Sequence, residues 1–495
     1  MSKYDVVIIG GGLGGLECGY TLAKNGLNVC ILEKNPVLGG CLQTFKRRGV
    51  TFDTGFHYIG GLSEGQPLHR IFNYFNLLDL PWHKLDEEAF DDVTINGETF
   101  HFANGHEQFA ETLAEKFPNC VNELKKYVAF LKNVGDNIFS SFEPRDHKEF
   151  FAESLFARSA YDFLNETISD SKLRDVLSGA SLKMELNAEK LPLYTFAQIN
   201  NSFIESAWRI KGGGHQISDS LAKSIEAFGG TIRTKANVTR LIEKDGLISA
   251  VEINGGEIIE TKNVISNIHP ANTMELVKES QALRKIYRNR INRLPNTYGM
   301  FTANISLKED CVPYKNKNHY IYEKGGLWDI SKYASGQKAQ CVLVSYQVPE
   351  EGERFTRNID LLTPMLWEEV EQWTESTVGR RGEAYEEFKK QKAEECIEIA
   401  SKHIPELRGA IEHVYTSTPL SYRDYTGTKE GSAYGVQKDY SQLMTTLLSP
   451  KTPIQNLFLT GQSLNLHGIL GVSMTSFFTC AEIIGMDKVA LFLKK

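Results

Sequence analysis

The sequence of 495 residues lacks several features that mark well-known classes of protein. No apolar run approaches the roughly 20 residues that a membrane-spanning helix needs, and residues 341–348, one of the longest runs, have only the length of a strand. Residues 1–5 lead directly into a strand-like run, without the charged and apolar regions of a secretory signal. We therefore expect a cytoplasmic protein, with peripheral membrane contact left open as an alternative.

Paired cysteines and an excess of positive charge are also missing. The eight cysteines are scattered and form no CxxC pair, which indicates reduced thiols and argues against zinc, so we predict no metal site. The formal net charge is −7, and an anionic chain has no general attraction for phosphate backbones, so we expect no nucleic-acid partner. Hydrophobic residues make up 41% and charged residues 24%, which excludes a disordered or disulfide-scaffold protein.

The most informative stretch is the first forty residues, which read as a strand, a glycine turn, a helix and a second strand. Residues 4–10 form an apolar run typical of a buried parallel strand. Gly10, Gly12 and Gly15 follow at GxGxxG spacing. The first glycine permits a tight turn, the second lets the backbone approach a pyrophosphate, and the third lets helix and strand pack. Glycine clusters also form ordinary turns, but the complete unit favours dinucleotide binding.

An acidic residue and further glycines indicate which dinucleotide is bound. Glu33 ends the second strand, where a carboxylate accepts hydrogen bonds from a ribose. The pair Gly39–Gly40 predicts another close backbone approach to the cofactor. Residues 457–485 read as a strand, a loop after Gly461 and a helix from around Gly471, which would aim a helix N-terminus at electron-rich atoms. These features favour FAD over NAD.

A third glycine run, at residues 212–214, resembles a second phosphate loop, but no acid-ended βαβ unit follows it. We interpret it as the entry to a helix. The chain then has no dedicated NADPH domain, and NAD(P)H remains an option only as a transient electron donor.

On these motifs the sequence resembles the superfamily of FAD-dependent phytoene desaturases, carotenoid isomerases and retinol saturases. Residues 39–61, which read GGCLQTFKRRGVTFDTGFHYIGG, are most similar to the retinol saturase branch, and so is the TGQ sequence at residues 460–462. The resemblance spans nearly the whole chain, and its two ends carry the most specific motifs.

The resemblance implies a non-covalently bound FAD and a position-by-position set of contacts. It implies that Gly10, Gly12 and Gly15 contact the pyrophosphate and that Glu33 contacts the ribose. It also implies that the backbone of Val238 forms hydrogen bonds with adenine. Two positions depart from the superfamily pattern: Cys41 stands where many relatives have arginine, and Gln462 replaces a usual aspartate. The cofactor-binding positions are Gly10, Gly12, Gly15, Glu33, Gly39, Gly40, Cys41, Val238, Gly461, Gln462, Gly471 and Val472.

The same resemblance and the order of predicted elements indicate an α/β fold with two domains. A Rossmann-like FAD-binding domain of the glutathione-reductase type, similar to those of amine oxidases and phytoene desaturases, is predicted to be discontinuous, over residues 1–75, 205–285 and 450–495. An α+β substrate domain, a sheet roofed by a helical cap, is predicted over residues 76–204 and 286–449.

The resemblance further implies an oxidoreductase acting on carbon–carbon double bonds of a lipophilic polyene or isoprenoid, working as a saturase-like reductase. A carotenoid desaturase or cis–trans isomerase is the alternative, because the sequence does not set the direction of hydride transfer. A non-catalytic prenyl-binding escort protein of the Rab-GDI type is a distant alternative, since such proteins do not need an intact FAD site.

Proton transfer has three candidates, because the flavin itself performs hydride transfer and no triad is required. His57 and Tyr58 lie on the segment that should pass beside the flavin ring, and His467 lies in the C-terminal loop. Each of them also fits a role as an ordinary pocket-lining residue. The aromatic stretch at residues 138–164 fits either a membrane-facing lid for the lipophilic substrate or core helices of the cap.

Overall fold

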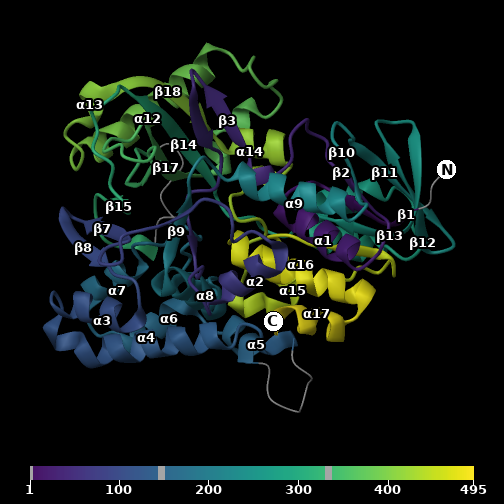
Figure 1. The fold of residues 1–495 in the computed structure, drawn as a ribbon, viewed down its shortest axis with the longest axis horizontal. Helices are drawn as coiled ribbons and strands as arrows, with labels where there is room; N and C mark the ends of the chain where they lie inside the picture. Colours follow the sequence, from purple (N-terminus) through teal and green to yellow (C-terminus); the bar gives the residue numbers. More distant parts are fainter. Residues whose placement is uncertain (1–3, 143–150, 329–336, 495) are drawn as a thin grey trace.

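The computed structural model describes residues 4–142, 151–328 and 337–494. Within these ranges the strands form two seven-stranded sheets, one three-stranded sheet and one two-stranded sheet. Figure 1 shows the two large sheets in separate regions of the molecule, with a layer of helices beneath the second sheet. No helix in the described ranges is both long enough and apolar enough to cross a membrane.

The first large sheet has the strand order β10-β2-β1-β13-β12-β11, with β19 paired to β13. The strands β10, β2, β1, β13 and β19 run parallel, whereas β11 and β12 pair antiparallel. Residues 6–9 and 29–32 are entirely buried, as expected for central parallel strands covered on both faces. The strands are β1 (Tyr4–Ile9), β2 (Val29–Leu32), β10 (Thr231–Arg233), β11 (Val238–Lys244), β12 (Leu247–Ile253), β13 (Glu257–Ser266) and β19 (Leu457–Leu459).

Three helices from distant parts of the chain pack together on the first sheet. They are α1 (Leu13–Lys24), α9 (His215–Ala227) and α16 (Gly468–Ile484), and α1 contacts both of the others. Between α1 and α16 the Ser473 hydroxyl donates a hydrogen bond to Oε1 of the buried carboxyl group of Glu17 at 2.5 Å. The parallel sheet and its helices confirm the predicted α/β class.

The second large sheet has the order β18-β14-β17-β16-β15-β7-β8 and is antiparallel except between β15 and β7. Its side chains alternate between two buried faces, as a period of two requires. Phe301, Val342 and Leu361 share a core with helix α12 (Glu383–Ser401), whereas Met300 and Leu343 face the cap helices. The strands are β7 (Asp91–Ile95), β8 (Glu98–Phe102), β14 (Gly299–Leu307), β15 (Asn318–Tyr322), β16 (Cys341–Tyr346), β17 (Asn358–Met365) and β18 (Ile411–Ser417).

The helical cap lies against the second sheet and shares one core with it. Its helices are α3 (His106–Ala114), α4 (Val121–Asp136), α5 (Phe151–Phe156), α6 (Ala160–Thr167), α7 (Ser171–Ser178) and α8 (Leu193–Glu205). The remaining strands are β3 (Thr44–Arg47), β4 (Val50–Asp53), β5 (Ile59–Gly60), β6 (Trp82–Lys84) and β9 (Ala207–Ile210). The remaining helices are α2 (Pro67–Phe75), α10 (Pro270–Leu276), α11 (Lys285–Asn292), α13 (Leu407–Ala410), α14 (Pro419–Thr426), α15 (Leu443–Thr446) and α17 (Met486–Leu493).

The chain passes between the two sheets several times. The first sheet takes its strands from residues 4–32, 231–266 and 457–459, and the second takes them from residues 91–102 and 299–417. The exact domain boundaries remain a prediction. Of the aromatic stretch at residues 138–164, residues 143–150 lie outside the described part of the chain.

Candidate active site

The turn between β1 and α1 has the geometry that a phosphate-binding loop requires. Gly10 has a positive φ of 95°, a conformation that glycine adopts without strain. A Cβ atom on Gly15 would lie 2.1 Å from the carbonyl oxygen of Gly10, so only glycine fits where the helix packs on the turn. Gly12 is the N-cap of α1, and the free amides of the first helical turn therefore point toward the space beyond β1.

Glu33 follows β2 directly and faces the same glycine loop. Its carboxylate accepts hydrogen bonds from the backbone N–H groups of Gly11 and Asn35, each at 2.8 Å. These bonds fix the carboxylate at the carboxyl ends of β1 and β2. Because a carboxylate has about four acceptor positions, two remain for ribose hydroxyls.

Asn267 is a central residue of this loop region that belongs to none of the glycine motifs. It follows β13, and its backbone N–H donates to Ile9 at 2.8 Å. Its side-chain oxygen would lie 2.8 Å from a Cβ on Gly14 and 2.7 Å from a Cβ on Gly461. The amide of Asn267 thus occupies the space that both glycines leave open. Its position at the carboxyl end of a strand beside β1 is the signal that could have identified it.

The second glycine pair packs on the first loop. Gly39 and Gly40 have positive φ angles of 108° and 56°, and the Gly39 N–H donates to the Gly11 carbonyl at 2.8 Å. A Cβ on Gly40 would lie 3.4 Å from the Cα of Gly12. The two loops therefore form one continuous backbone surface. Beside them, burial raises the pKa of the Cys41 thiol to about 11, so it is protonated at neutral pH.

The C-terminal glycine loop differs from the prediction in one respect. Gly461 has a positive φ of 97° just after β19, as the predicted loop requires. Helix α16, however, begins at Gly468, almost one turn before Gly471. The free amides of its first turn therefore belong to residues 468–470. Gly471 instead packs against Leu466, whose backbone a Cβ at this position would approach to 2.5 Å.

A single cavity of about 640 Å³ connects all these loops. It also reaches Val238 at the start of β11, and it continues between the first sheet and the cap to the second sheet. Two predicted positions, Gly15 and Gly471, lie behind its wall. The predicted residues that line the cavity are Gly10, Gly12, Glu33, Gly39, Gly40, Cys41, His57, Tyr58, Val238, Gly461, Gln462, His467 and Val472.

His57 lies in the cavity wall beside a buried aspartate. Its Nδ1 is 3.7 Å from Oδ2 of Asp360, and neither ring nitrogen has a hydrogen-bond partner in the described part of the chain. Burial, assisted by the nearby Arg209 guanidinium, lowers the pKa of His57 to about 4. Burial raises the pKa of Asp360 to about 7. At neutral pH His57 is therefore an uncharged imidazole.

Tyr58 belongs to a buried hydrogen-bonded group. Its hydroxyl donates to Oδ2 of Asp91 at 2.8 Å and lies 2.5 Å from the hydroxyl of Tyr320. Because Tyr58 donates to Asp91, the Tyr320 hydroxyl donates to Tyr58. Burial raises the pKa of Tyr58 well above its usual value, and the neighbouring Asp91 carboxylate adds to the effect. Tyr58 is thus a weaker acid than a free tyrosine.

His467 is the N-cap residue of α16 and lines the cavity at the start of that helix. Its Nε2 donates to the backbone carbonyl of Lys183 at 3.0 Å, and its ring lies 4.6 Å from that of Tyr434. Burial lowers the pKa of His467 to about 4. The imidazole therefore connects the cap to α16 as a neutral group.

Lys183 is a cavity residue that no sequence motif indicated. It lies between α7 and α8 and lines the cavity with Tyr58. Burial lowers the pKa of its ammonium to about 8, against the opposing attraction of Asp91. Lys183 remains mostly protonated at neutral pH.

Comparison with protein families identifies the class of this site. Residues 13–484 match the model of the family described as flavin containing amine oxidoreductase. The chain belongs to this family. A flavin cofactor follows from membership, and the glycine loops, Glu33 and the α16 N-terminus are the groups of this chain that fit one.

Curated relatives of this flavin oxidoreductase cover almost its whole length. All-trans-retinol 13,14-reductases from Danio rerio and Homo sapiens are each 27% identical to it, over 97% of this chain and 86% of theirs. A chloroplastic prolycopene isomerase from Daucus carota is 24% identical over 98% of this chain and 80% of its own. The chain is therefore a flavin oxidoreductase related to retinol saturases and carotenoid isomerases.

Solved structures show the same fold at lower sequence identity. An oxidoreductase from Methanosarcina mazei matches with a TM-score of 0.63 and 17% identity, over 95% of this chain and 98% of that one. A putrescine oxidase with putrescine bound matches with a TM-score of 0.63 and 16% identity, over 98% of this chain and 99% of that one. These matches confirm the fold class and carry no information about the substrate.

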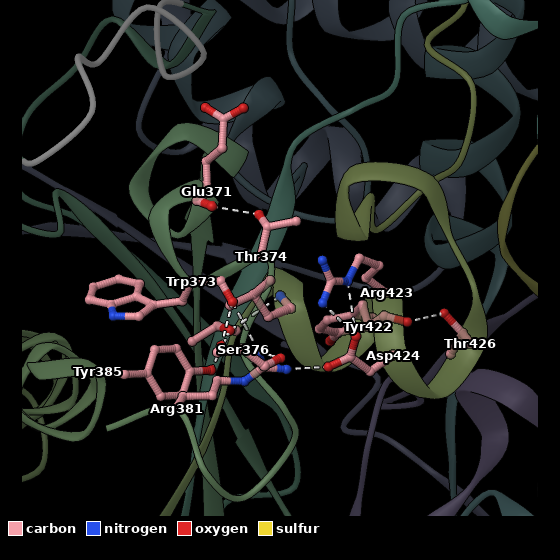
Figure 2. A network of polar contacts seen from close by, with 12 residues as sticks. Glu371, Trp373, Thr374, Ser376, Arg381, Tyr385, Tyr422, Arg423, Asp424 and Thr426 are labelled. Carbon is pink, nitrogen blue, oxygen red and sulfur yellow. Dashed lines mark hydrogen bonds and ion pairs between the residues drawn. The ribbon is translucent and has the colours of Figure 1, made fainter. Parts of the chain in front are cut away.

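Helix α14 of this flavin oxidoreductase contributes Tyr422, Tyr425 and Thr426 to the cavity wall, and Figure 2 shows the polar contacts that surround this helix. The nearly buried guanidinium of Arg381, with 5% of its side chain exposed, binds the carboxylate of Asp424. Arg381 also donates to the backbone of Ser376 at 2.9 Å, and Arg423 holds Asp424 from the other side. Asn35, which follows β2, donates to the Tyr425 carbonyl at 2.7 Å. We call Arg381, Asp424 and α14 the clasp.

Proposed function

We propose that this flavin oxidoreductase uses FAD to reduce a carbon–carbon double bond of a lipophilic polyene or isoprenoid. One observation carries the proposal: the cavity that begins at the glycine loops and Glu33 continues into an apolar chamber. A cofactor and a long apolar ligand would thus share one enclosed space. The reduced flavin supplies a hydride there, and the chain's own residues bind, orient and exclude water.

The assignment of residues follows their places along the cavity. The backbone of the two glycine loops and the carboxylate of Glu33 hold the dinucleotide, and the first turn of α16 faces its electron-rich end. The protonated thiol of Cys41 is a poor nucleophile, which supports non-covalent binding of FAD. Proton transfer by His57, Tyr58 or His467 stays a prediction, and NAD(P)H is proposed as a transient electron donor.

The names of the relatives support a substrate with carbon–carbon double bonds and leave the direction of hydride transfer open. Retinol reductases favour reduction, whereas a prolycopene isomerase at 24% identity keeps isomerisation, and with it desaturation, as the second candidate. A Danio rerio relative at 24% identity carries the name inactive all-trans-retinol 13,14-reductase, so similarity alone does not establish turnover. Family membership and the complete glycine loops argue against an escort protein that works only by binding.

The test is anaerobic photoreduction of the bound flavin, followed by addition of a retinoid or a carotenoid. We expect the flavin absorbance to return as the polyene loses one double bond. If no polyene reoxidises the flavin, the reductase proposal fails. If the oxidised enzyme instead introduces a double bond, or the reduced enzyme changes only the geometry of the polyene, the second candidate replaces it.

A lipophilic substrate is poorly soluble in water, so the protein needs a source from which to collect it. We propose that the protein collects its lipophilic ligand through peripheral contact with a membrane surface. Sedimentation with phosphatidylcholine vesicles that contain the polyene tests this contact. Protein that stays in the supernatant while it still takes up the polyene would contradict it.

A further inference from the structure

The substrate end of the cavity has a largely apolar wall. Side chains from the cap, the second sheet and the α16 loop contribute Ile199, Phe203, Met300, Leu343, Leu362 and Leu466. Such a wall suits a hydrocarbon chain along most of its length.

Most polar side chains in this wall already have a hydrogen-bond partner within the protein. Gln198 donates to the Val134 carbonyl at 2.9 Å, and Ser202 donates to the Ile199 carbonyl at 2.9 Å. Tyr58 donates to Asp91, as described above. These groups have little left to offer a ligand.

Two polar side chains of this wall lack such a partner within the part of the chain that the structure describes, the neutral imidazole of His57 and the ammonium of Lys183, and of these two only Lys183 is charged. Its side chain is 10% exposed, and its Nζ lies 3.9 Å from Oδ2 of Asp91, too far for a hydrogen bond. The ammonium lies 3.8 Å from the centre of the Phe203 ring. Within the described ranges no hydrogen-bond acceptor is found for its three N–H groups. The backbone of Lys183 is held in place, because its carbonyl accepts the bond from His467.

An ammonium at this position has consequences for what can bind. A pure hydrocarbon that filled the chamber would strip water from the ammonium and give nothing in return, which is unfavourable. A ligand with an oxygen atom at one end would accept one of the free N–H groups. Since Asp91 already balances the charge of Lys183, a neutral oxygen suffices.

We infer that Lys183 binds an oxygen-bearing terminus, a hydroxyl or carbonyl, of the lipophilic substrate. The inference rests on the proposed function, because it names the end group of the substrate that the same cavity takes. It assigns to Lys183 the choice between oxygenated polyenes and hydrocarbon polyenes of the same length.

The experiment measures binding to the oxidised holoenzyme, where no reduction takes place. All-trans-retinol is compared with the hydrocarbon in which a methyl group replaces its CH2OH group, using the absorbance of the bound polyene. We expect the wild type to bind the alcohol roughly tenfold more tightly, the effect of one hydrogen bond to a charged group. Lys183→Met should remove this preference and leave the hydrocarbon affinity unchanged or higher.

Matched variants separate this role from a structural one. Lys183→Arg keeps a cation and should keep a preference for the alcohol. Lys125→Met removes an exposed lysine from α4 of the same cap and should bind both probes like the wild type. Thermal unfolding of each variant shows whether it is folded.

Two results would overturn the inference: equal affinity of the wild type for both probes, or an equal loss of affinity for both in a folded Lys183→Met variant. The first result is obtained with the wild type alone, so the inference can be tested even if the variant does not fold. The binding measurement needs no turnover. Failure of polyenes to reoxidise the reduced flavin would therefore contradict the proposed function but not the preference for the alcohol over the hydrocarbon.

Discussion

The two ends of the cavity are built from different parts of the protein chain. At the flavin end five glycines line the cavity, Gly10, Gly12, Gly39, Gly40 and Gly461, and they bring the backbone itself to the wall. At the substrate end the wall is mostly side chains, which come from the cap, the second sheet and the α16 loop. A cofactor shared by a large family can be held by backbone, whereas the choice of substrate depends on side chains that are free to vary.

The strongest test of this comparison is a change in the backbone-lined end. Gly15→Ala places a Cβ 2.1 Å from the Gly10 carbonyl oxygen, so the turn or α1 must move. We expect no flavin-bound protein, because overpacking at a backbone atom costs about 3 kcal/mol or more and distorts the phosphate loop. Flavin content of the purified variant measures this. Gly409→Ala, where a Cβ meets open space, should retain flavin.

A smaller effect is expected at the clasp, where side chains from the second-sheet region reach over the flavin end. Arg381→Met removes a buried cation and leaves Asp424 with Arg423 alone, which should lower the free energy of unfolding by about 3 kcal/mol. Flavin should also dissociate faster. Urea unfolding and stopped-flow release of flavin fluorescence check both effects. If the exposed Arg380→Met variant behaves the same way, the clasp has no special role.

Glu17 lies between α1 and α16, behind the flavin end, and makes stability depend on pH. Burial raises the pKa of its carboxyl from 4.5 to about 8. Between these values the folded state holds a proton that the unfolded state has lost, so stability falls as pH rises. Glu17→Gln removes this loss and should be more stable than the wild type at pH 9 by up to about 5 kcal/mol, the value that linkage gives for this shift in pKa. The two proteins should converge near pH 5 in urea titrations; a constant difference across pH would contradict the assignment.

The smallest and sharpest test pairs one change from each end. Glu33→Gln keeps the size of the side chain and removes its charge, so flavin affinity should fall roughly tenfold. Tyr58→Phe removes the hydrogen bond to Asp91 and should weaken binding of a polyene to the oxidised enzyme a few-fold, about 1 kcal/mol. Fluorescence titrations with flavin and with polyene measure both variants. The comparison fails if either change affects the two ligands equally.

The same division decides how much the sequence could predict. The glycine turn with Glu33, and separately the loop after Gly461, are each formed by residues that lie close together in the chain. The spacing within each of these segments therefore indicates a nucleotide site. Lys183 belongs to no local pattern. It becomes a cavity residue because α8 supplies Phe203 and β7 supplies Asp91, both of which are set by packing over long sequence distances.

Two further differences between the prediction and the structure have physical reasons. The sequence predicts the start of α16 near Gly471, whereas in the structure His467 occupies the N-cap position and the helix begins at Gly468. No local motif indicates the role of Asn267, because that role depends on glycines in two other segments, Gly14 and Gly461. Contacts of this kind are visible only when the strands are side by side.

The order of strands in the first sheet has a consequence for how the protein is made. β1 pairs with β2 nearby, but its other neighbour, β13, is synthesised more than two hundred residues later, and β19 and α16 come later still. At a ribosomal rate of roughly 10 residues per second, the glycine turn waits on the order of 40 seconds for the helix that closes the flavin end. A nascent chain released before residue 457 would therefore carry the nucleotide motif and yet have no enclosed place for the flavin.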